Sequence, residues 1–389
     1  MGTDFNKLRL KYHGSPEKLN EILQAECRYK TAAKLPDTLA NPDFIFPSLA
    51  VAEMATSDAV AEIHADMIVP GESVLDMTCG LGIDTFHIAG RASSVTTVEL
   101  NHESYEAACH NVQALGTGNV TVIEGDSVKW LEENDRHFDT IFIDPARRDS
   151  AGRHFELKDC RPDVTASLSL LLERCNRLII KCSPMVSIDA AIKELGVECD
   201  VTLIGTHKEC KEVVLVHTKD VAAADSNTLR NAKGSRLIRC VTVGKEEFSF
   251  TTDDERDATA KFDRPAPGGY LYEPYPSVMK GGGYRTLSSR FGIYKLHPNT
   301  HLYYSPEPIA EFPGEPFKIE EIIPFSKQEI KTFAKRHLQI NVSTRNFPLS
   351  APELVKKLKV KEGGNQMVFG TTDCNAEKIL IVVSLAPKS

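Results

Sequence analysis

The chain contains the stretch SVLDMTCGLGIDT at residues 73–85. A short apolar strand here ends at Asp76, and a glycine turn leads directly into a helical pattern. Such a turn presents bare backbone at a helix N-terminus, where the polar end of a cofactor can bind. A second predicted strand, Val95–Val98, is followed by Glu99, about twenty residues beyond the glycines, where an acid can accept both hydrogen bonds of a ribose diol. The pattern predicts a nucleoside-cofactor site.

The details of the turn indicate which cofactor it binds. A dinucleotide fingerprint requires G-x-G-x-x-G, whereas here Gly80 and Gly82 are present and Thr85 stands in place of the third glycine. Asp76 is poorly suited to face a pyrophosphate, but it can bind the α-ammonium group of S-adenosylmethionine. We therefore expect S-adenosylmethionine as the cofactor. The alternative is a tight strand-to-helix turn that binds nothing.

The composition is that of an ordinary soluble globular protein. The chain has 389 residues, of which 41% are hydrophobic and 26% charged, so two or three domains are expected. No apolar run has membrane-spanning length, and no leader pattern opens the chain. The ten cysteines are scattered without zinc-ligand spacing, which is typical of free thiols in a reducing compartment. We expect a cytoplasmic monomer without a membrane or metal partner.

The charge is distributed unevenly. The net charge is −8, which argues against non-specific nucleic-acid binding. Residues 316–389, however, carry 12 Lys and Arg against 7 Asp and Glu, whereas the remainder carries 34 against 47. Such an asymmetry favours a nucleic-acid-binding module at the C-terminus, although a solvated basic face would look the same.

Residues 1–70 are predicted to form an N-terminal helical extension. Apolar periodicity predicts helices over Lys18–Lys34 and Ser57–Met67. Between them, Pro42–Pro47 is predicted to be an extended linker, because a proline at each end excludes a helix. Its two aromatic residues, Phe44 and Phe46, are expected to be exposed.

Strands and helices alternate within the predicted domain 71–220, which indicates a parallel sheet covered on both faces. The last two of seven strands are separated by only Thr206–Glu212, so they should form an antiparallel hairpin. Six parallel strands and one antiparallel strand are the arrangement of the Rossmann-like class I methyltransferase fold. The predicted strands are Ser73–Met77, Val95–Glu99, Val120–Glu124, Thr140–Asp144, Arg177–Cys182, Asp200–Gly205 and Val213–His217.

The remainder is predicted to form small α+β domains. Asp220–Asn231 is polar and aperiodic, as expected of a linker. A β-rich domain is predicted over residues 232–315 and an α+β domain over residues 316–389. The elements predicted in the last domain are strand Lys318–Ile323, helix Lys327–Leu338, strand Gln339–Thr344, helix Ala351–Leu358, and strands Gln366–Thr371 and Lys378–Val383.

The fourth predicted strand ends in Asp144-Pro145-Ala146-Arg147. Here the chain resembles Rossmann-fold RNA and DNA methyltransferases, in which a D/N-P-P-aromatic motif lies beside the methyl donor. An acid at this position can accept a hydrogen bond from an exocyclic amine, and the proline directs a backbone carbonyl toward the same nitrogen. We predict Asp144, Pro145 and Arg147 as catalytic residues.

The second proline and the aromatic of that motif are missing, so another group must stack on the base. The candidates are Arg147, Phe155 and the loop with Phe44 and Phe46. At the end of the third strand, Asp126 is expected to bind the adenine amino group, while Asp126-Ser127 could equally begin a helix. The complete set of predicted cofactor-binding residues is Asp76, Thr78, Cys79, Gly80, Gly82, Thr85, Glu99, Leu100, Asp126, Ser127 and Asp144.

Over nearly its full length the chain resembles a bacterial family of class I methyltransferases with a ferredoxin-like insert and a THUMP-like C-terminal domain. The matching stretches are Asp76–Thr85, Asp144–Asp149, Lys181–Ile188, Tyr270–Pro298, Arg345–Ser350 and Lys356–Gly364. The glycine turn also resembles that of cap-type guanine-N2 methyltransferases. The resemblance implies an RNA substrate, tRNA or rRNA, held by the C-terminal domain. Phosphate contacts are then expected from Arg345, Lys356, Lys357, Lys359 and Lys361.

Three functions remain open from the sequence. The first is methylation of an exocyclic base nitrogen, such as guanine N2, in structured RNA. The second is uridine C5 methylation, because Cys182-Ser183-Pro184 follows the fifth strand where uridine-C5 methyltransferases place a nucleophilic cysteine. A buried structural thiol is the simpler interpretation of Cys182. The third is an RNA-binding protein with a vestigial methyltransferase fold.

Overall fold

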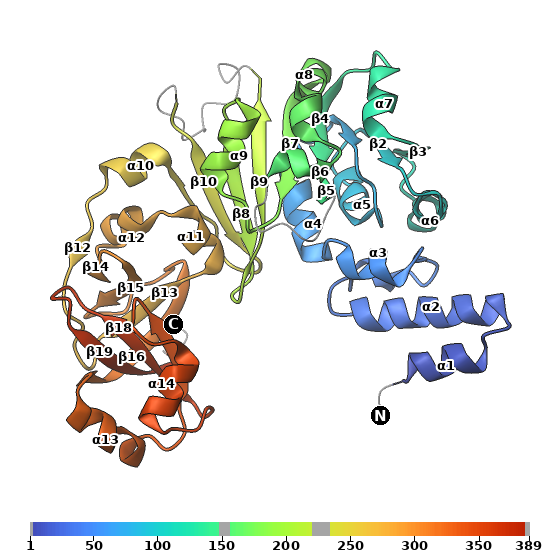
Figure 1. The fold of residues 1–389 in the computed structure, drawn as a ribbon. Coiled ribbons are helices and arrows are strands. Elements are labelled where there is room, and N and C mark those ends of the chain that lie inside the picture. Colours follow the sequence, from blue (N-terminus) through green and yellow to red (C-terminus); the bar gives the residue numbers. More distant parts are fainter. Residues whose placement is uncertain (1–2, 148–155, 220–233, 386–389) are drawn as a thin grey trace. The chain divides into compact units, whose positions relative to one another are not determined.

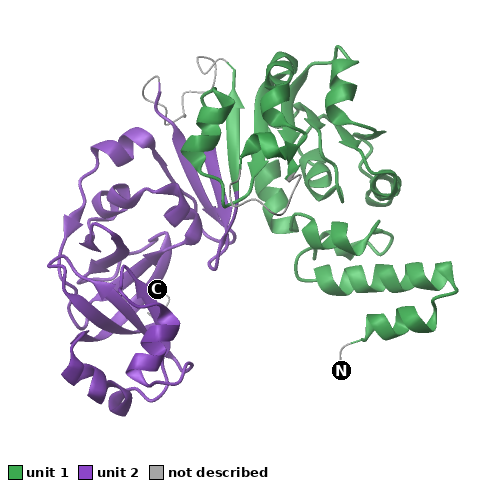
Figure 2. Cartoon of the chain, viewed as in Figure 1, with its two compact units in different colours: residues 1–200, 213–226 green, residues 201–212, 227–389 purple. Residues whose placement is uncertain are grey.

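A computed structural model of the chain describes residues 3–147, 156–219 and 234–385. The chain divides into two compact units, one of residues 1–200 and 213–226 and one of residues 201–212 and 227–389 (Figure 2). The predicted linker 220–231 and Phe155 lie outside the described residues. Among the helices that are described, none is long and apolar enough to cross a membrane.

The first unit begins with a group of short helices (Figure 1). Two of them match the predicted helices, because α2 covers Pro16–Thr31 and α4 covers Asp58–Ala65. The linker from Pro42 to Pro47 is non-helical, as expected. The others are α1 (Phe5–Lys11), the 3-10 turn η1 (Thr38–Ala40) and α3 (Leu49–Met54).

The two aromatic residues of the linker are buried, so the expectation that they are exposed was wrong. Phe44 is 1% exposed and Phe46 is 2% exposed, and their rings pack edge to face with centroids 5.3 Å apart. They share a core cluster with Leu81 and Ile83, which follow β1 (Ser73–Asp76). Prolines exclude a helix but say nothing about burial. Neither ring is therefore available to stack on a substrate base.

The sheet of this unit has the strand order β3-β2-β1-β4-β7-β9. All neighbours are parallel except β7 and β9, which are antiparallel. The strands are β1, β2 (Ser94–Glu99), β3 (Val120–Glu124), β4 (Phe138–Ile143), β7 (Cys175–Cys182) and β9 (Cys210–Thr218). The helices between them are α5 (Ile83–Ala89), α6 (His102–Leu115), α7 (Ser127–Glu132), α8 (Val164–Arg174) and α9 (Ile188–Leu195).

Polar residues gather at the carboxyl ends of the parallel strands. Strands β2 and β4 are nearly continuously buried, as expected for a sheet covered on both faces. The carboxyl ends of parallel strands meet at one edge of a sheet, where ligands bind in open α/β folds. Asp76 ends β1, Glu99 ends β2 and Asp144 follows β4 directly. The predicted Rossmann-like fold is thus confirmed, and the three acids lie at the carboxyl ends of its parallel strands.

The second unit contains β8 (Asp200–Gly205) from its second residue onward, and the tight turn Thr206–Glu209 follows this strand. In this turn the N–H of Thr206 donates to the carbonyl of Glu209 at 2.8 Å. Strand β10 (Leu237–Thr242) runs parallel to β8 and antiparallel to β11 (Phe248–Thr251). The sequence predicted a β-rich domain here, but not that β10 pairs with β8.

The rest of the second unit is built on one sheet of eight strands, in the order β12-β14-β15-β13-β16-β19-β18-β17. The strands are β12 (Lys261–Phe262), β13 (Tyr270–Pro274), β14 (Tyr294–His297), β15 (Thr300–Ser305), β16 (Gly314–Pro324), β17 (Asn341–Arg345), β18 (Gln366–Thr372) and β19 (Lys378–Leu385). The helices are α10 (Thr252–Asp257), α11 (Pro276–Gly281), α12 (Tyr284–Phe291), α13 (Lys327–Arg336) and α14 (Ala351–Leu358). The elements expected from residue 316 onward are present, whereas α11 and α12 were not foreseen.

The burial of Phe46 predicts that this linker stabilises the first unit. Replacing Phe46 by Ala should lower the free energy of unfolding by about 3–5 kcal/mol, because it leaves a cavity in the core. Urea unfolding followed by the fluorescence of Trp130, the single tryptophan, reports on this unit. Tyr29→Ala is the control, since that ring is 66% exposed, and it should change the value by no more than about 1 kcal/mol. Equal effects of the two substitutions would contradict the assigned role of Phe46.

Candidate active site

The loop between β1 and α5 has the backbone that a cofactor-binding turn requires. Gly80 and Gly82 both adopt left-handed conformations, with φ of 57° and 83°. A Cβ at position 82 would lie 2.7 Å from the ring of Phe86, so only glycine fits there. Gly82 is also the N-cap of α5, which leaves the first N–H groups of that helix beside the loop. A glycine backbone beside the N–H groups of a helix start is suited to binding the polar end of S-adenosylmethionine.

Glu99 holds this loop from the neighbouring strand. One carboxylate oxygen, Oε2, accepts from the N–H of Gly80 at 2.7 Å, and the other, Oε1, accepts from the N–H of Asn101 at 2.8 Å. The side chain is only half-buried, and Leu100 beside it is 67% exposed. A carboxylate has further acceptor sites beyond these two bonds. The ribose contact of Glu99 and the role of Leu100 stay predictions.

Asp76 is buried beneath the loop, with 1% exposure. Its carboxylate accepts from the N–H of Thr78 at 3.0 Å and from the hydroxyls of Thr85 and Thr97. Burial raises the pKa of Asp76 to about 6, and the hydrogen bond from Thr85 opposes this shift. The carboxylate thus ties β1 to the start of α5, and its contact with an α-ammonium group stays a prediction.

Two further predicted cofactor residues have structural partners. Cys79 is buried, its N–H donates to the carbonyl of Val98 at 3.2 Å, and burial raises the pKa of its thiol. Asp126 caps α7 by accepting from the N–H groups of Val128 and Lys129 at 3.0 and 3.1 Å. Ser127 is buried in the first turn of that helix. The capping role weighed for Asp126 is present, and its adenine contact stays a prediction.

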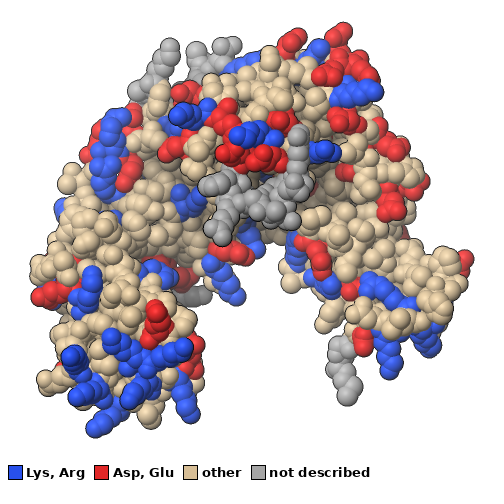
Figure 3. All heavy atoms as spheres, in the orientation of Figure 1, with Lys and Arg blue, Asp and Glu red and all other residues tan. Residues whose placement is uncertain are grey.

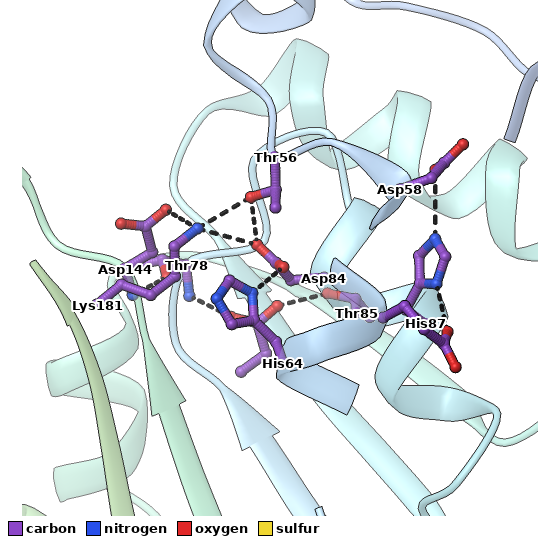
Figure 4. A network of polar contacts seen from close by, with 11 residues as sticks. Thr56, Asp58, His64, Thr78, Asp84, Thr85, His87, Asp144 and Lys181 are labelled. Atoms are coloured by element: carbon purple, nitrogen blue, oxygen red, sulfur yellow. Dashed lines mark hydrogen bonds and ion pairs between the residues drawn. The ribbon is translucent and has the colours of Figure 1, made fainter. Parts of the chain in front are cut away.

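Asp144, the predicted amine acceptor, is held at two points (Figure 4). Its backbone N–H donates to the hydroxyl of Thr78 in the cofactor loop at 2.8 Å. Its carboxylate oxygen Oδ2 lies 2.8 Å from the ammonium nitrogen of Lys181 on β7. The Asp144 side chain is 47% exposed, whereas that of Lys181 is 6% exposed. An accessible carboxylate therefore stands next to the loop with a fixed orientation.

Lys181 also contacts a second carboxylate, that of Asp84 in the first turn of α5, at 3.2 Å. Asp84 accepts a hydrogen bond from Thr56 at 2.7 Å and lies 2.7 Å from Nδ1 of His64. Burial disfavours the charged form of Asp84, but Lys181 and His64 outweigh it and hold its pKa well below the ordinary value. No sequence pattern predicted this network, although a lone lysine in the apolar strand Leu178–Cys182 is a signal for a buried partner.

The residues after Asp144 are only partly described. Ala146–Arg147 forms β5, which pairs with Cys160–Arg161 of β6 in a two-stranded ribbon. The side chain of Arg147 and all of Phe155 lie outside the described residues, so their proposed stacking roles stay predictions.

Cys182 does not have the surroundings of an activated nucleophile. Burial raises the pKa of this thiol, and the neighbouring Cys160 and Asp144 raise it further. Its Sγ lies 3.8 Å from the carbonyl oxygen of Ile180 on its own strand. Since the thiolate is the reactive form, these surroundings favour a structural thiol.

The predicted RNA-binding residues all belong to the second unit. Arg345 is bound internally, because its Nε lies 2.5 Å from Glu273 and another nitrogen donates to Ser343 at 2.9 Å. Lysine and arginine side chains gather over α13 and α14 in Figure 3. The lysines of this surface are Lys327, Lys331 and Lys335 of α13, and Lys356, Lys357, Lys359 and Lys361 of α14 and the residues that follow it.

The raised pKa of Asp76 predicts a pH-dependent stability difference. A carboxyl whose pKa is higher in the folded state loses its contribution to stability as the pH rises from about 4 through 6. Asp76→Asn, which cannot ionise, should therefore gain stability relative to wild type over this range, by up to about 3 kcal/mol. Urea unfolding of both proteins, followed by Trp130 fluorescence between pH values of about 4.5 and 7.5, measures the difference. A difference independent of pH would contradict this account.

Three family models match separate parts of the chain. Residues 74–149 match a methyltransferase domain, residues 270–313 a ferredoxin-like domain and residues 314–384 a THUMP-like domain. The crystal structure of a protein from Porphyromonas gingivalis W83 that is assigned as a methyltransferase superposes with a TM-score of 0.84 at 29% identity. The similarity covers 99% of this chain and 95% of that one. Fold and domain content are therefore shared over essentially the whole length.

Curated relatives are similar over smaller portions. An uncharacterized S-adenosylmethionine-dependent methyltransferase of Mycobacterium tuberculosis, Rv3037c, is 26% identical over 70% of this chain and 69% of its own length. An uncharacterized RNA methyltransferase of Mycoplasma mobile is 42% identical over 22% of this chain and 23% of its own. The 23S rRNA (uracil(1939)-C(5))-methyltransferase RlmD of Cronobacter sakazakii is 33% identical over 34% of this chain and 31% of its own.

The matched methyltransferase domain contains the glycine loop, Glu99 and Asp144, which the sheet brings to one edge. The described residues contain no cluster of His, Cys, Asp or Glu suited to a metal ion. This chain is a class I S-adenosylmethionine-dependent methyltransferase that carries ferredoxin-like and THUMP-like domains.

Proposed function

We propose that this methyltransferase acts on structured RNA, tRNA or rRNA, and transfers the methyl group to an exocyclic base nitrogen such as guanine N2. The observation that supports this most is the accessible carboxylate of Asp144, which Thr78 and Lys181 orient beside the cofactor loop. An exocyclic amine is a hydrogen-bond donor, so a fixed carboxylate can select and orient it.

Within the first unit, different residues would bind the cofactor and orient the acceptor amine. The loop with Gly80 and Gly82, together with Glu99, would hold S-adenosylmethionine, which supplies an electrophilic methyl group. Asp144 would accept one N–H of the amine, and the carbonyl of Pro145 would accept the other. These two bonds direct the nitrogen lone pair toward the methyl group, and Asp144 can take the proton that the nitrogen releases.

Two lines of evidence support RNA as the substrate. Residues 314–384 match a THUMP-like domain, and two relatives are named as RNA methyltransferases or rRNA methyltransferases. The lysines of α13 and α14 supply positive charge without base specificity, as a phosphate-binding surface requires. We accordingly propose residues 71–220 as the catalytic domain, 232–315 as the ferredoxin-like domain and 316–389 as the RNA-binding domain.

Uridine C5 methylation is the second candidate. It is favoured by the similarity to RlmD, whose name specifies that chemistry, and by the place of Cys182 at the end of β7, before Ser183 and Pro184. The raised pKa of the Cys182 thiol argues against it. A vestigial fold is not favoured, because the glycine loop, Glu99 and the oriented Asp144 are all in place.

The carboxylate of Asp144 gives the most direct test of this function. Asp144→Ala should reduce methyl transfer about 100-fold or more while leaving the affinity for S-adenosylmethionine nearly unchanged, because the side chain orients the acceptor. The assay uses radiolabelled S-adenosylmethionine and total RNA from a strain that lacks the gene, and calorimetry measures cofactor binding. The control Asp135→Ala removes an aspartate whose side chain is fully exposed and should be as active as wild type.

Two outcomes would redirect this assignment. Full activity of Asp144→Ala on the RNA would exclude Asp144 as the amine acceptor. A covalent adduct with 5-fluorouridine-substituted RNA that Cys182→Ala removes would establish uridine C5 chemistry instead. Mass spectrometry of nucleosides from the methylated RNA identifies the base directly.

The basic surface of the second unit gives a test of RNA binding. Replacing Lys356, Lys357, Lys359 and Lys361 by Ala should weaken RNA binding and make the slope of log K against log salt shallower by about 0.7 for each phosphate that is no longer neutralised. Affinity for S-adenosylmethionine should stay the same. The control Lys211→Ala removes a lysine paired with Glu209 and should leave the slope unchanged. An unaltered slope in the fourfold variant would show that these lysines only face solvent.

A further inference from the structure

Lys181 occupies an unusual position for a lysine. It lies in β7 between β4 and β9, and its side chain is 6% exposed. Oxygen atoms of three side chains in the described part of the chain lie close to its ammonium nitrogen: Asp144 at 2.8 Å, Thr56 at 2.9 Å and Asp84 at 3.2 Å. Two of these contacts are hydrogen bonds and the third is an ion pair, and together they hold the ammonium group in place.

Asp84 is the buried carboxylate that neutralises this lysine. Its side chain is 13% exposed, and despite its burial its pKa is held low by Lys181 and His64. The hydroxyl of Thr56 bonds to both Lys181 and Asp84, so the three side chains contact one another. The buried charge is therefore balanced without Asp144, whose carboxylate is accessible to solvent. Its contact with Lys181 is not required for charge balance.

The contact instead determines how Asp144 presents its second oxygen. The backbone of Asp144 is bound to Thr78 and its Oδ2 to Lys181. The other oxygen, Oδ1, has no hydrogen-bond partner among the residues that the structure describes. With the main chain and one oxygen both fixed, the remaining oxygen faces a single direction, as the acceptor of a substrate amine must (Figure 4).

We propose that Lys181 is a positioning residue for methyl transfer, which orients the Asp144 carboxylate and is itself held by Thr56 and by Asp84, the partner of His64. This inference rests on the proposed function, because it assumes that Asp144 receives the acceptor. It extends the catalytic machinery into the N-terminal segment, since Thr56 and His64 precede the predicted methyltransferase domain. Lys181, Thr56, Asp84 and His64 were not among the predicted site residues.

The test begins with Lys181→Met, which keeps the length of the side chain and removes the ammonium group. We expect kcat on total RNA from the deletion strain to fall about 100-fold, with the KM for S-adenosylmethionine and the Kd for RNA within about twofold of wild type. Lys181→Arg, which can contact both carboxylates, should recover part of the lost kcat. The matched control is Lys295→Met, which replaces another buried lysine, 3% exposed, in the second unit, and should leave kcat unchanged.

A second variant separates positioning from folding. Lys181→Met removes the ammonium partner of Asp84 and leaves it with His64, whereas Lys181→Met combined with Asp84→Asn removes both charges and should restore the thermal midpoint. We expect the double variant to stay as slow as Lys181→Met, because nothing orients Asp144 in either. Recovery of kcat together with the thermal midpoint would overturn the proposal, since Lys181 would then act only by neutralising Asp84.

Crystal structures of wild type and Lys181→Met give a readout that does not require the RNA substrate. The proposal expects the Asp144 side chain to change rotamer or to occupy several when Lys181 is absent. An unchanged rotamer with full order would overturn it. If wild type methylates no RNA, the proposed function fails, and the two crystal structures still decide whether Lys181 orients Asp144.

Discussion

The buried ammonium group of Lys181 is the interaction on which the catalytic unit depends. It joins β7, the start of α5, the end of β4 and the N-terminal segment through Asp84, Asp144 and Thr56. A lysine inside a sheet is tolerated only when its charge is balanced and its donors are satisfied. Meeting this constraint fixes the carboxylate of Asp144 relative to the start of α5.

The predicted cofactor loop is also held by carboxylates. Glu99 and Asp76 were expected to bind the ligand. In the structure, Glu99 at the end of β2 accepts from the N–H of Gly80, and the buried Asp76 accepts from the N–H of Thr78. Acids that organise a turn and acids that bind a cofactor need the same placement at the ends of parallel strands. The residue pattern alone therefore does not separate the two roles, and both can be served by one carboxylate with several acceptor sites.

The sequence predicted the secondary structure of the chain well where periodicity is strong. Strands β3 and β8 and helix α14 have the predicted bounds, because buried strands and amphipathic helices carry clear patterns. Helices α11 and α12 were missed, since proline and three glycines interrupt their short patterns. The aromatic linker was misjudged because burial of Phe44 and Phe46 depends on Leu81 and Ile83, which are distant in the chain.

The sequence by itself determined the class of fold, the glycine turn and the acid at the end of β4, because each follows from the order of residues along a short stretch of chain. Only the tertiary structure decided that Asp144 is bound to Lys181, that Asp84, the partner of His64, supports this lysine, and that the N-terminal segment belongs to the catalytic unit. These contacts join residues separated by as many as 125 positions. No local pattern encodes such a contact, since it exists only once the sheet has assembled.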